Sequence, residues 1–351
     1  MNIWLISDTH FGLKNNSKVW EEHFRECFDK FVFPLFEKKA RKGDILIHCG
    51  DVFDNRQTVG LTTLAFTMDI FEKLGRMFSQ VYVLCGNHDA YEKDSNDITS
   101  IDCLKHIPNI SVIKEPKSIA MPNGKVVGFV PWINDNGLLS ETLCGMDDCD
   151  IVVCHADFNG VTMNASGTKS ESQLHLDDTR LDCRIYSGHI HHRQIYKNVV
   201  YVGSPYQMSQ NDRDNDRGVM CVKENGNEEF YRNGVSAEFK RVDYEEVKDL
   251  PLRDFKEFCK RKYIDICVDS DLLSKLSFHK IYGYINNNSD IYNINFVPKK
   301  SSLTIDVPKV SMSECVSIED MLDKYVDNVL EYDDKVKSNI KKIAKKLING
   351  Q

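Results

Sequence analysis

The sequence predicts an α/β fold whose strands pair largely in parallel. Short apolar runs rich in β-branched residues recur through the first 230 residues, at 3–7, 45–49, 81–85, 126–132, 151–155, 184–188 and 199–203. Runs of this length and composition are typical of strands buried on both faces of a sheet. Helix-like segments lie between several of them, and strands that alternate with helices favour an α/β arrangement.

Two of these helical segments have clear apolar spacing. The first spans residues 19–41, where Pro34 predicts a kink or a break. The second spans residues 61–78. Both are long enough to cover one face of a sheet.

The pattern changes near residue 230, which indicates a domain boundary. Residues 1–230 are predicted to form a core, and residues 231–305 a small second α/β unit. In that unit, residues 263–285 have a strand–helix–strand pattern, and 291–297 resemble another strand. Residues 311–351 are predicted to form a helical tail.

The last helix of the tail is strongly amphipathic. An apolar stripe runs along Val336, Ile340, Ile343, Ala344 and Leu347, with six lysines on the remaining faces. Such a helix either packs on its own domain or docks in the groove of a partner.

Composition excludes several classes of protein. The 351 residues carry a net charge of −8, which argues against a histone-like coat for nucleic acid but allows a nuclease with a local phosphate site. The 12 cysteines include no C-x-x-C pair and often lie in apolar runs, which predicts buried thiols in a reducing compartment. We find no signal-peptide pattern and no apolar run of about 20 residues, so we expect a cytoplasmic protein.

Polar clusters directly follow five of the predicted strands. They are Asp8-Thr9-His10, Gly50 to Asp54, Gly86 to Asp89, His155, and Gly188 to His191. Ligands of open α/β sheets bind beyond the carboxyl ends of the strands, so these clusters are expected to converge. Each alone has an ordinary interpretation, such as a turn, a surface triplet or a core histidine, but the ordered set indicates a metal centre.

Aspartate, histidine and asparagine are ligands for divalent transition metals. Seven such residues are enough for two ions: Asp8, His10, Asp51, Asn87, His155, His189 and His191. Two ions about 4 Å apart can hold the attacking and leaving oxygens of a phosphoryl group, with one carboxylate bridging them. Asp51 is the natural bridge, and the i, i+2 spacing of Asp8 with His10 is expected to point both side chains the same way.

The order D-x-H, GD-x-x-D, GNHD, H and G-H-x-H resembles the calcineurin-like metallophosphoesterase superfamily over residues 3–204. GNHD, together with GSPYQMSQ at 203–210, resembles the SbcD-type DNA double-strand-break nucleases, and within them the T-even-type phage branch. The resemblance implies a four-layer α-β-β-α sandwich with a small α/β capping domain and a C-terminal helical tail.

The resemblance also implies individual roles. Asp8, His10, Asp51 and His191 would hold the first ion, and Asp51, Asn87, His155 and His189 the second, with Mn²⁺ preferred and Mg²⁺ as the alternative. His88 would face the phosphate without binding metal. We further expect Asp54 to orient and charge His88, as a carboxylate does for a catalytic imidazole.

Basic and polar loop residues near these motifs are candidates for contacts with a DNA backbone. They are Lys14, Asn15, Asn16, Arg56, Arg193, Arg213 and Arg217. Scattered basic residues of this kind are more often simply solvated.

By resemblance, the function expected is metal-dependent exonucleolytic or endonucleolytic hydrolysis of DNA ends and hairpins. The expected partner is an SMC- or ABC-like coiled-coil ATPase, bound through the C-terminal helices, with a homodimer of the nuclease inside a heterotetramer. If a phage encodes the chain, the compartment is the host cytoplasm. Two alternatives are a metallophosphoesterase acting on phosphoprotein or small phosphodiesters, and a non-catalytic scaffold for the ATPase.

Overall fold

The structure is a computed structural model that describes residues 1–269, 291–299, 326–327 and 334–348. The chain divides into two compact units, Met1–Val297 and Pro298–Gln351. The described strands form two six-stranded sheets and one three-stranded sheet. No helix among these residues is both long and apolar enough to span a bilayer.

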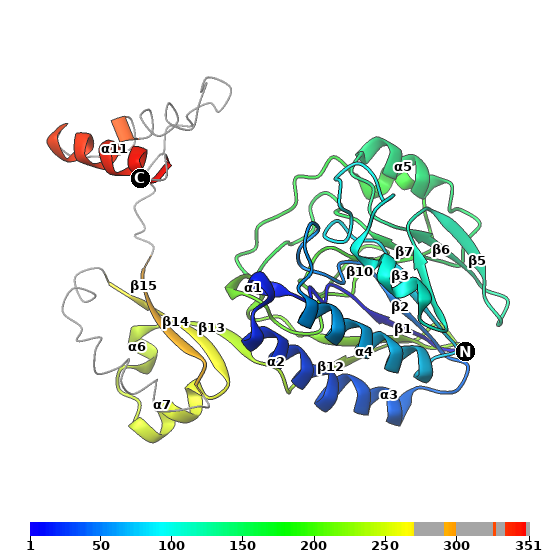
Figure 1. Cartoon of the computed structure of the whole chain (residues 1–351), viewed down its shortest axis with the longest axis horizontal. Helices are drawn as coiled ribbons and strands as arrows, with labels where there is room; N and C mark the ends of the chain where they lie inside the picture. The colour runs from blue at the N-terminus through cyan, green and yellow to red at the C-terminus, as the bar shows by residue number, and fades with distance from the viewer. Residues whose placement is uncertain (270–290, 300–325, 328–333, 349–351) are drawn as a thin grey trace. The chain divides into compact units, whose positions relative to one another are not determined.

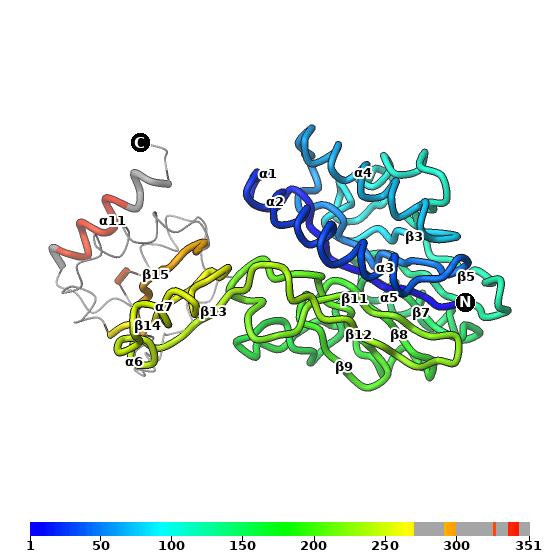
Figure 2. The backbone as a smooth tube through the Cα atoms, turned by 90° about the horizontal axis from the view of Figure 1, so that it is seen from below, coloured from blue at the N-terminus to red at the C-terminus, as the bar shows by residue number. Residues whose placement is uncertain are grey.

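The first sheet has the order β12-β11-β1-β2-β3-β4. Its strands are β1 (Ile3–Ile6), β2 (Ile45–His48), β3 (Gln80–Leu84), β4 (Ile110–Ile113), β11 (Gly218–Val222) and β12 (Glu228–Arg232). β1 to β4 pair in parallel, as predicted, whereas β11 joins β1 antiparallel from far along the chain (Figure 2).

The second sheet has the order β5-β6-β7-β8-β10-β9. Its strands are β5 (Lys117–Ala120), β6 (Val126–Val130), β7 (Ile151–His155), β8 (Arg184–Gly188), β9 (Gln194–Tyr196) and β10 (Val199–Tyr201). The four central strands are parallel, and β5 and β9 close the edges antiparallel. β5 and β9 were not predicted from the sequence, because they are short and polar and have only a weak apolar pattern.

Helices cover the outer faces of both sheets (Figure 1). They are α1 (Leu13–Asn16), α2 (Lys18–Cys27), the π-helical η1 (Phe28–Val32), α3 (Phe33–Lys39), α4 (Leu61–Met77) and α5 (Asn136–Cys144). Pro34 lies in the first turn of α3, directly after the π-helical turn. Proline cannot donate the helical N–H bond, so the break predicted at this residue is confirmed as a π-bulge between two α-helices.

Three apolar clusters define the four layers. Along β1, Trp4 packs with the α2, α3 and α4 helices, while Leu5 faces the second sheet, because side chains alternate along a strand. On the far side, Leu139 of α5 packs against Val152 of β7. The predicted α-β-β-α sandwich is therefore confirmed.

The three-stranded sheet contains β13 (Glu238–Asp243), β14 (Lys262–Val268) and β15 (Asn293–Pro298), accompanied by α6 (Tyr244–Val247) and α7 (Leu252–Cys259). It contacts α2 through the ring stack of Trp20 on Tyr263 and the ion pair of Glu26 with Arg261. The predicted helix and strand between 270 and 290 lie outside the described residues.

In the second unit, the structure describes α11 (Asp334–Ile348), which coincides with the amphipathic last helix predicted for the tail. Lys337 and Lys341 of this helix both bind Asp327. Residues 311–325 of the predicted tail lie outside the described residues.

Candidate metal centre

All five predicted clusters lie at one edge of the double sheet, after β1, β2, β3, β7 and β8. They border an open cleft of about 230 Å³. The cleft is lined by His10, Leu13, Lys14, Asp51, Asp54, Asn87, His88, His189, His191, Met208, Ser209 and Asp212. Of the seven predicted ligands, Asp8 and His155 are buried behind this lining.

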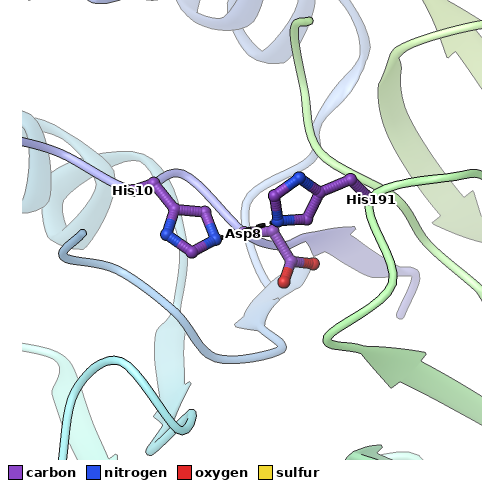
Figure 3. Close-up of side chains that lie close together, drawn as sticks. All are labelled: Asp8, His10 and His191. Carbon is purple, nitrogen blue, oxygen red and sulfur yellow. Dashed lines mark hydrogen bonds between the residues drawn. The ribbon is translucent and has the colours of Figure 1, made fainter. Parts of the chain in front are cut away.

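The first group of donors consists of Asp8, His10 and His191, whose ligand atoms lie within 4.8 Å of one another (Figure 3). His10 Nε2 and His191 Nε2 face each other at 3.0 Å. Two imidazole nitrogens at this distance are compatible when at most one carries a proton. The geometry suits two lone pairs that share one cation.

The second group consists of Asp51, His155 and His189. The Asn87 side-chain oxygen lies 3.0 Å from His155 Nε2 and 2.9 Å from His189 Nδ1, so it completes this group. Oxygen and imidazole donors of this kind suit a divalent transition metal.

Asp51 lies between the two groups. Its Oδ2 is 3.5 Å from His10 Nε2 and 3.4 Å from His155 Nε2. One oxygen therefore faces a donor from each group, which is the arrangement that a bridging carboxylate requires.

Each of the two central carboxylates has one oxygen anchored by the main chain. Asp51 Oδ1 accepts from the His88 N–H at 2.8 Å, and Asp8 Oδ1 accepts from the His189 N–H at 3.0 Å. Asp8 Oδ2 is buried with no hydrogen-bond partner. A buried carboxylate oxygen without a partner is costly, and a cation bound between the donors would satisfy it. The residues present thus fit two divalent ions.

Two of the histidines are oriented through their other ring nitrogen. His155 Nδ1 donates to the Cys49 carbonyl at 2.8 Å, which leaves Nε2 free as a donor to metal. His191 Nδ1 lies 3.5 Å from Asp212 Oδ1, whereas His10 Nδ1 is buried without a hydrogen-bond partner, 3.6 Å from Asp54 Oδ1. Such outer partners fix the tautomer and direction of a metal-binding imidazole.

Burial and mutual charge separate the pKa values in this cluster. Burial alone would raise the pKa of Asp51, but the imidazoles of His155 and His10 outweigh it and hold that pKa well below its usual range. Burial, reinforced by His155, lowers the pKa of His189 to about 3. Burial also lowers the pKa of His10 well below its usual value. Asp51 is therefore charged beside neutral His10 and His189, whereas the same carboxylate outweighs burial and raises the pKa of His155 to about 9, so a cation would replace the proton on that ring.

The backbone around the ligands is unusual. Asp8, His10, Asp51 and His189 all have positive φ, at 52°, 43°, 57° and 77°. The expected reason for the shared direction of Asp8 and His10 is therefore wrong, because the segment is not an extended strand. Left-handed turns aim the side chains instead. Such conformations cost about 1 kcal/mol or more each and persist where surrounding structure holds them.

Two motif glycines permit this crowding. A Cβ on Gly86 would lie 2.2 Å from Asp51 Oδ1, and a Cβ on Gly50, whose φ is +104°, would lie 2.4 Å from His155 Nδ1. Any larger residue at either position would displace a ligand.

His88 lines the cleft beside both donor groups. Its Nδ1 donates to the main-chain oxygen of Asp54 at 2.6 Å, which leaves Nε2 as the free ring nitrogen. The expected pairing of His88 with the Asp54 carboxylate is corrected: that carboxylate lies beside His10 Nδ1. Asp54 thus orients His88 through its main-chain oxygen. The ring of His88 is close enough to His10 and Asp51 to form a third possible metal group.

Asp89, whose purpose the sequence left open, is a structural hub. It is fully buried and accepts hydrogen bonds from the main-chain N–H groups of Asp51, Val52, Phe53 and Gly86. Burial and the charge of Asp51 raise its pKa to about 7. Asp89 therefore fastens the GNHD loop to the loop that carries the bridging Asp51.

Two further site residues escaped sequence reasoning. Asp212 binds His191 and also accepts from the Met208 N–H at 2.9 Å and from Arg217 at 3.2 Å. The S-x-x-D capping pattern at 209–212 is a signal for its turn but not for its partner. Trp132, directly after β6, stacks on His189 with 5.0 Å between ring centroids.

Two other histidines near the motifs, His48 and His192, do not line the cleft. His48 Nε2 donates to the Thr9 hydroxyl at 3.0 Å, and burial lowers its pKa to about 3. His192 points away from the donors and lies 3.3 Å from the Asn215 side chain.

The basic candidates separate into two groups. Lys14 and Asn15 are exposed in a left-handed turn, Lys14 lines the cleft, and Arg56 is half-buried. Arg217 is buried and binds Ser204 and Asp212, so the expectation that it contacts DNA is wrong.

The other two arginines are engaged with the protein. Arg193 stacks over the Phe230 ring at 4.1 Å, and burial lowers its pKa. Arg213 donates to the Gln210 carbonyl at 2.6 Å. Neither arrangement leaves the guanidinium free in the cleft.

The chain is similar to several known proteins. Exonuclease subunit 1 of Enterobacteria phage T4 is 26% identical over 265 residues, covering 72% of this chain and 76% of that protein. A protein of unknown function from Aquifex aeolicus is 18% identical, covers 52% of this chain and 87% of its own, and has a TM-score of 0.31. The 5′-nucleotidase of Candida albicans is 14% identical, covers 58% of this chain and 46% of its own, and has a TM-score of 0.32.

The family model for calcineurin-like phosphoesterases matches residues 1–193, more than half of the chain. The match spans the five motifs up to His191 and agrees with the four-layer fold and the two donor groups. The chain belongs to the calcineurin-like phosphoesterase family, a family of metal-dependent phosphoester hydrolases.

Proposed function

We propose that this protein is a two-metal DNA nuclease that hydrolyses phosphodiester bonds at DNA ends. The observation that carries the proposal is the position of Asp51 Oδ2 between His10 and His155, with His88 beside them in an open cleft. The similarity to exonuclease subunit 1 of phage T4 supports DNA as the substrate.

Two divalent ions held by the seven donors would supply positive charge to the scissile phosphate and make water a stronger nucleophile. We propose Mn²⁺ as the physiological ion, with Mg²⁺ as the alternative. Asp51 serves both ions, and the neutral imidazoles bind with the ring nitrogen that their outer partners leave free.

His88 acts on the phosphate in this proposal. Because Nδ1 donates to the Asp54 carbonyl, Nε2 faces the cleft and can hydrogen-bond to a phosphate oxygen or protonate the leaving oxygen. Lys14, exposed at the rim of the cleft, is the best-placed candidate for a neighbouring phosphate.

The last helix supports a proposed ATPase partner. In α11, Ile343 is 62% exposed although it belongs to the apolar stripe of the sequence. An exposed apolar face on a lysine-rich helix suits a groove in another protein. We propose that this partner is an SMC-like ATPase, bound by a dimer of the nuclease.

In the full-length chain, Ile343→Asp should then abolish co-purification with the ATPase, whereas the neighbouring Lys342→Asp should retain it. If both variants bind equally well, α11 is not the docking helix.

The catalytic proposal is tested with end-labelled duplex and hairpin DNA beside a phosphopeptide, with Mn²⁺ or EDTA. We expect Mn²⁺-dependent DNA cleavage that is absent in Asp51→Asn and retained in Asp147→Asn, an exposed aspartate away from the cleft. Dephosphorylation of the peptide alone would favour a phosphoprotein phosphatase. No hydrolysis of any substrate, with intact ATPase binding, would favour a scaffold.

A further inference from the structure

A second cavity adjoins the metal centre. It has a volume of about 330 Å³ and lies between the loop after the GNHD motif and α5. Trp132 lines this cavity, and the same indole ring stacks on His189 and meets the His155 ring edge-on at 6.1 Å. The cavity and the metal centre therefore share one wall.

The walls of this cavity suit a flat, uncharged ring. Trp132, Pro116 and Leu138 give apolar surfaces, and Ser95 and Thr142 add hydroxyl groups. Leu138, at the rim, is 54% exposed although it is large and apolar. A mostly apolar cleft with a few polar groups is the usual composition of a small-ligand site.

The charges of the cavity separate it from the phosphate site. Its ionisable lining consists of Lys93, Asp94 and Asp135, which together carry one net negative charge. A phosphate would be repelled by the net negative charge of the cavity. The metal donors next to the cavity would bind cations, and those cations would attract a phosphate. A ligand in which a short linker joins a neutral group to a phosphate would place the neutral group in the cavity and the phosphate at the metal centre.

The shared wall is held rigidly in place. The main-chain N–H of Trp132 donates to the Cys85 carbonyl at 2.9 Å, and the Asn96 side-chain amide donates to the main-chain carbonyl of Trp132 at 2.9 Å. Asn96 also reaches the Lys114 carbonyl at 3.2 Å. A preformed aromatic wall stacks on a ligand with little ordering cost.

We propose that this cavity is a nucleobase subsite, which holds the base of the nucleotide next to the scissile phosphate, between Trp132 and α5. The inference rests on the proposed function, since it takes the phosphodiester of a nucleic acid as the substrate. A base lies one sugar away from its phosphate, and stacking on an aromatic side chain accepts any base. The subsite would therefore position the scissile bond without reading the sequence.

The test compares chromogenic diesters with the same leaving group. Thymidine 5′-(p-nitrophenyl phosphate) and thymidine 3′-(p-nitrophenyl phosphate) carry a base on one side, and methyl p-nitrophenyl phosphate carries none. We expect one of the thymidine esters to exceed the methyl ester in kcat/KM by about tenfold, as expected for one base stack.

Variants that fill the cavity should remove this preference. Thr142→Trp on α5 and Ser95→Phe on the facing loop each occupy the space, and circular dichroism reports whether they fold. Glu141→Trp is the matched control, because Glu141 is exposed on the same helix and does not line the cavity. It should keep the full preference for the thymidine ester.

Equal hydrolysis of all three esters by the native protein would overturn the subsite and leave the phosphodiesterase intact. Retention of the preference in both folded filling variants would overturn it as well, and would leave the cavity to another occupant, such as a protein side chain. If no diester is hydrolysed and DNA is not cut, the proposed function itself fails.

Discussion

The sheet edge that carries the metal centre and the three-stranded sheet, both in the first unit, bury different kinds of side chain. At the edge, the chain buries the carboxylates of Asp8, Asp51 and Asp89 together with several imidazoles. In the three-stranded sheet, the described buried residues are an apolar cluster from Val247 to Ile294, with Asp265 as a buried carboxylate. Asp265 is paired with Arg241 at 2.7 Å and with the Asn295 amide at 3.2 Å.

The difference shows what each region is built for. Paired charges and apolar contacts make the small sheet a packing element. The edge instead gathers like charges and left-handed turns around the metal donors, which costs stability. Asp89 and the glycines Gly50 and Gly86 offset that cost by fixing the loops around the donors.

The largest effect is expected from His88, a residue of the metal-centre edge that acts on the substrate and does not stabilise the fold. His88→Gln should lower kcat about 10³-fold, because the group that faces the phosphate is lost while the donors remain. Calorimetry should show unchanged Mn²⁺ binding, and His106→Gln, a surface histidine, should behave as the native protein. Loss of metal binding in His88→Gln would mean that His88 is a ligand.

The second test removes Asp89, which fastens two loops of the metal-centre edge together. Asp89→Ala leaves four buried main-chain N–H groups without an acceptor and should lower the free energy of unfolding by about 3 kcal/mol. Urea denaturation measures the loss, and Asp97→Ala, an exposed aspartate of the same loop, is the control. A loss below about 0.5 kcal/mol, the usual range for surface substitutions, would contradict the role of Asp89.

A smaller effect is expected from an outer partner. Asp212→Asn keeps the size of the side chain and removes the charge beside His191, so Mn²⁺ affinity should fall about tenfold. Titration calorimetry gives the affinity. Asp216→Asn, a substitution at an exposed residue of the same loop, should bind as the native protein does. Equal affinities for all three proteins would make Asp212 a purely structural residue.

The smallest effect concerns the attachment of the three-stranded sheet to α2. The hydrogen bond from Arg261 lowers the pKa of Glu26 from 4.5 to about 2. A depressed carboxyl pKa stabilises the fold above pH 4.5, and that contribution is lost as the pH falls toward 2. Arg261 is 38% exposed, so the contribution should be only about 1 kcal/mol.

Glu26→Gln should therefore be less stable than the native protein at pH 7, and this difference should shrink steadily as the pH falls from 4.5 toward 2, as measured by denaturant unfolding. Glu22→Gln, on the exposed side of α2, should show no such difference at any of these pH values. A gap between Glu26→Gln and native protein that persists at the low pH would assign the effect to packing.

Several features could be predicted from the residues alone: the α/β class, the central strands of both sheets, the break at Pro34 and the seven candidate ligands. These features are local, because buried parallel strands are continuous apolar runs and the ligands follow them directly. The motif order then predicted the family, which the match over residues 1–193 confirmed.

The contacts among those residues, by contrast, depend on how the chain folds in three dimensions. Asp89 binds N–H groups 36 to 38 residues away, Asp212 approaches His191 from a later loop, and Trp132 from the second sheet stacks on His189. Arg217, predicted as a surface contact, is buried because Asp212 requires its charge. Hydrogen bonds and charge pairs between distant loops leave no periodic signal in a sequence, so the partners of GNHD became visible only when the sheets brought the loops together.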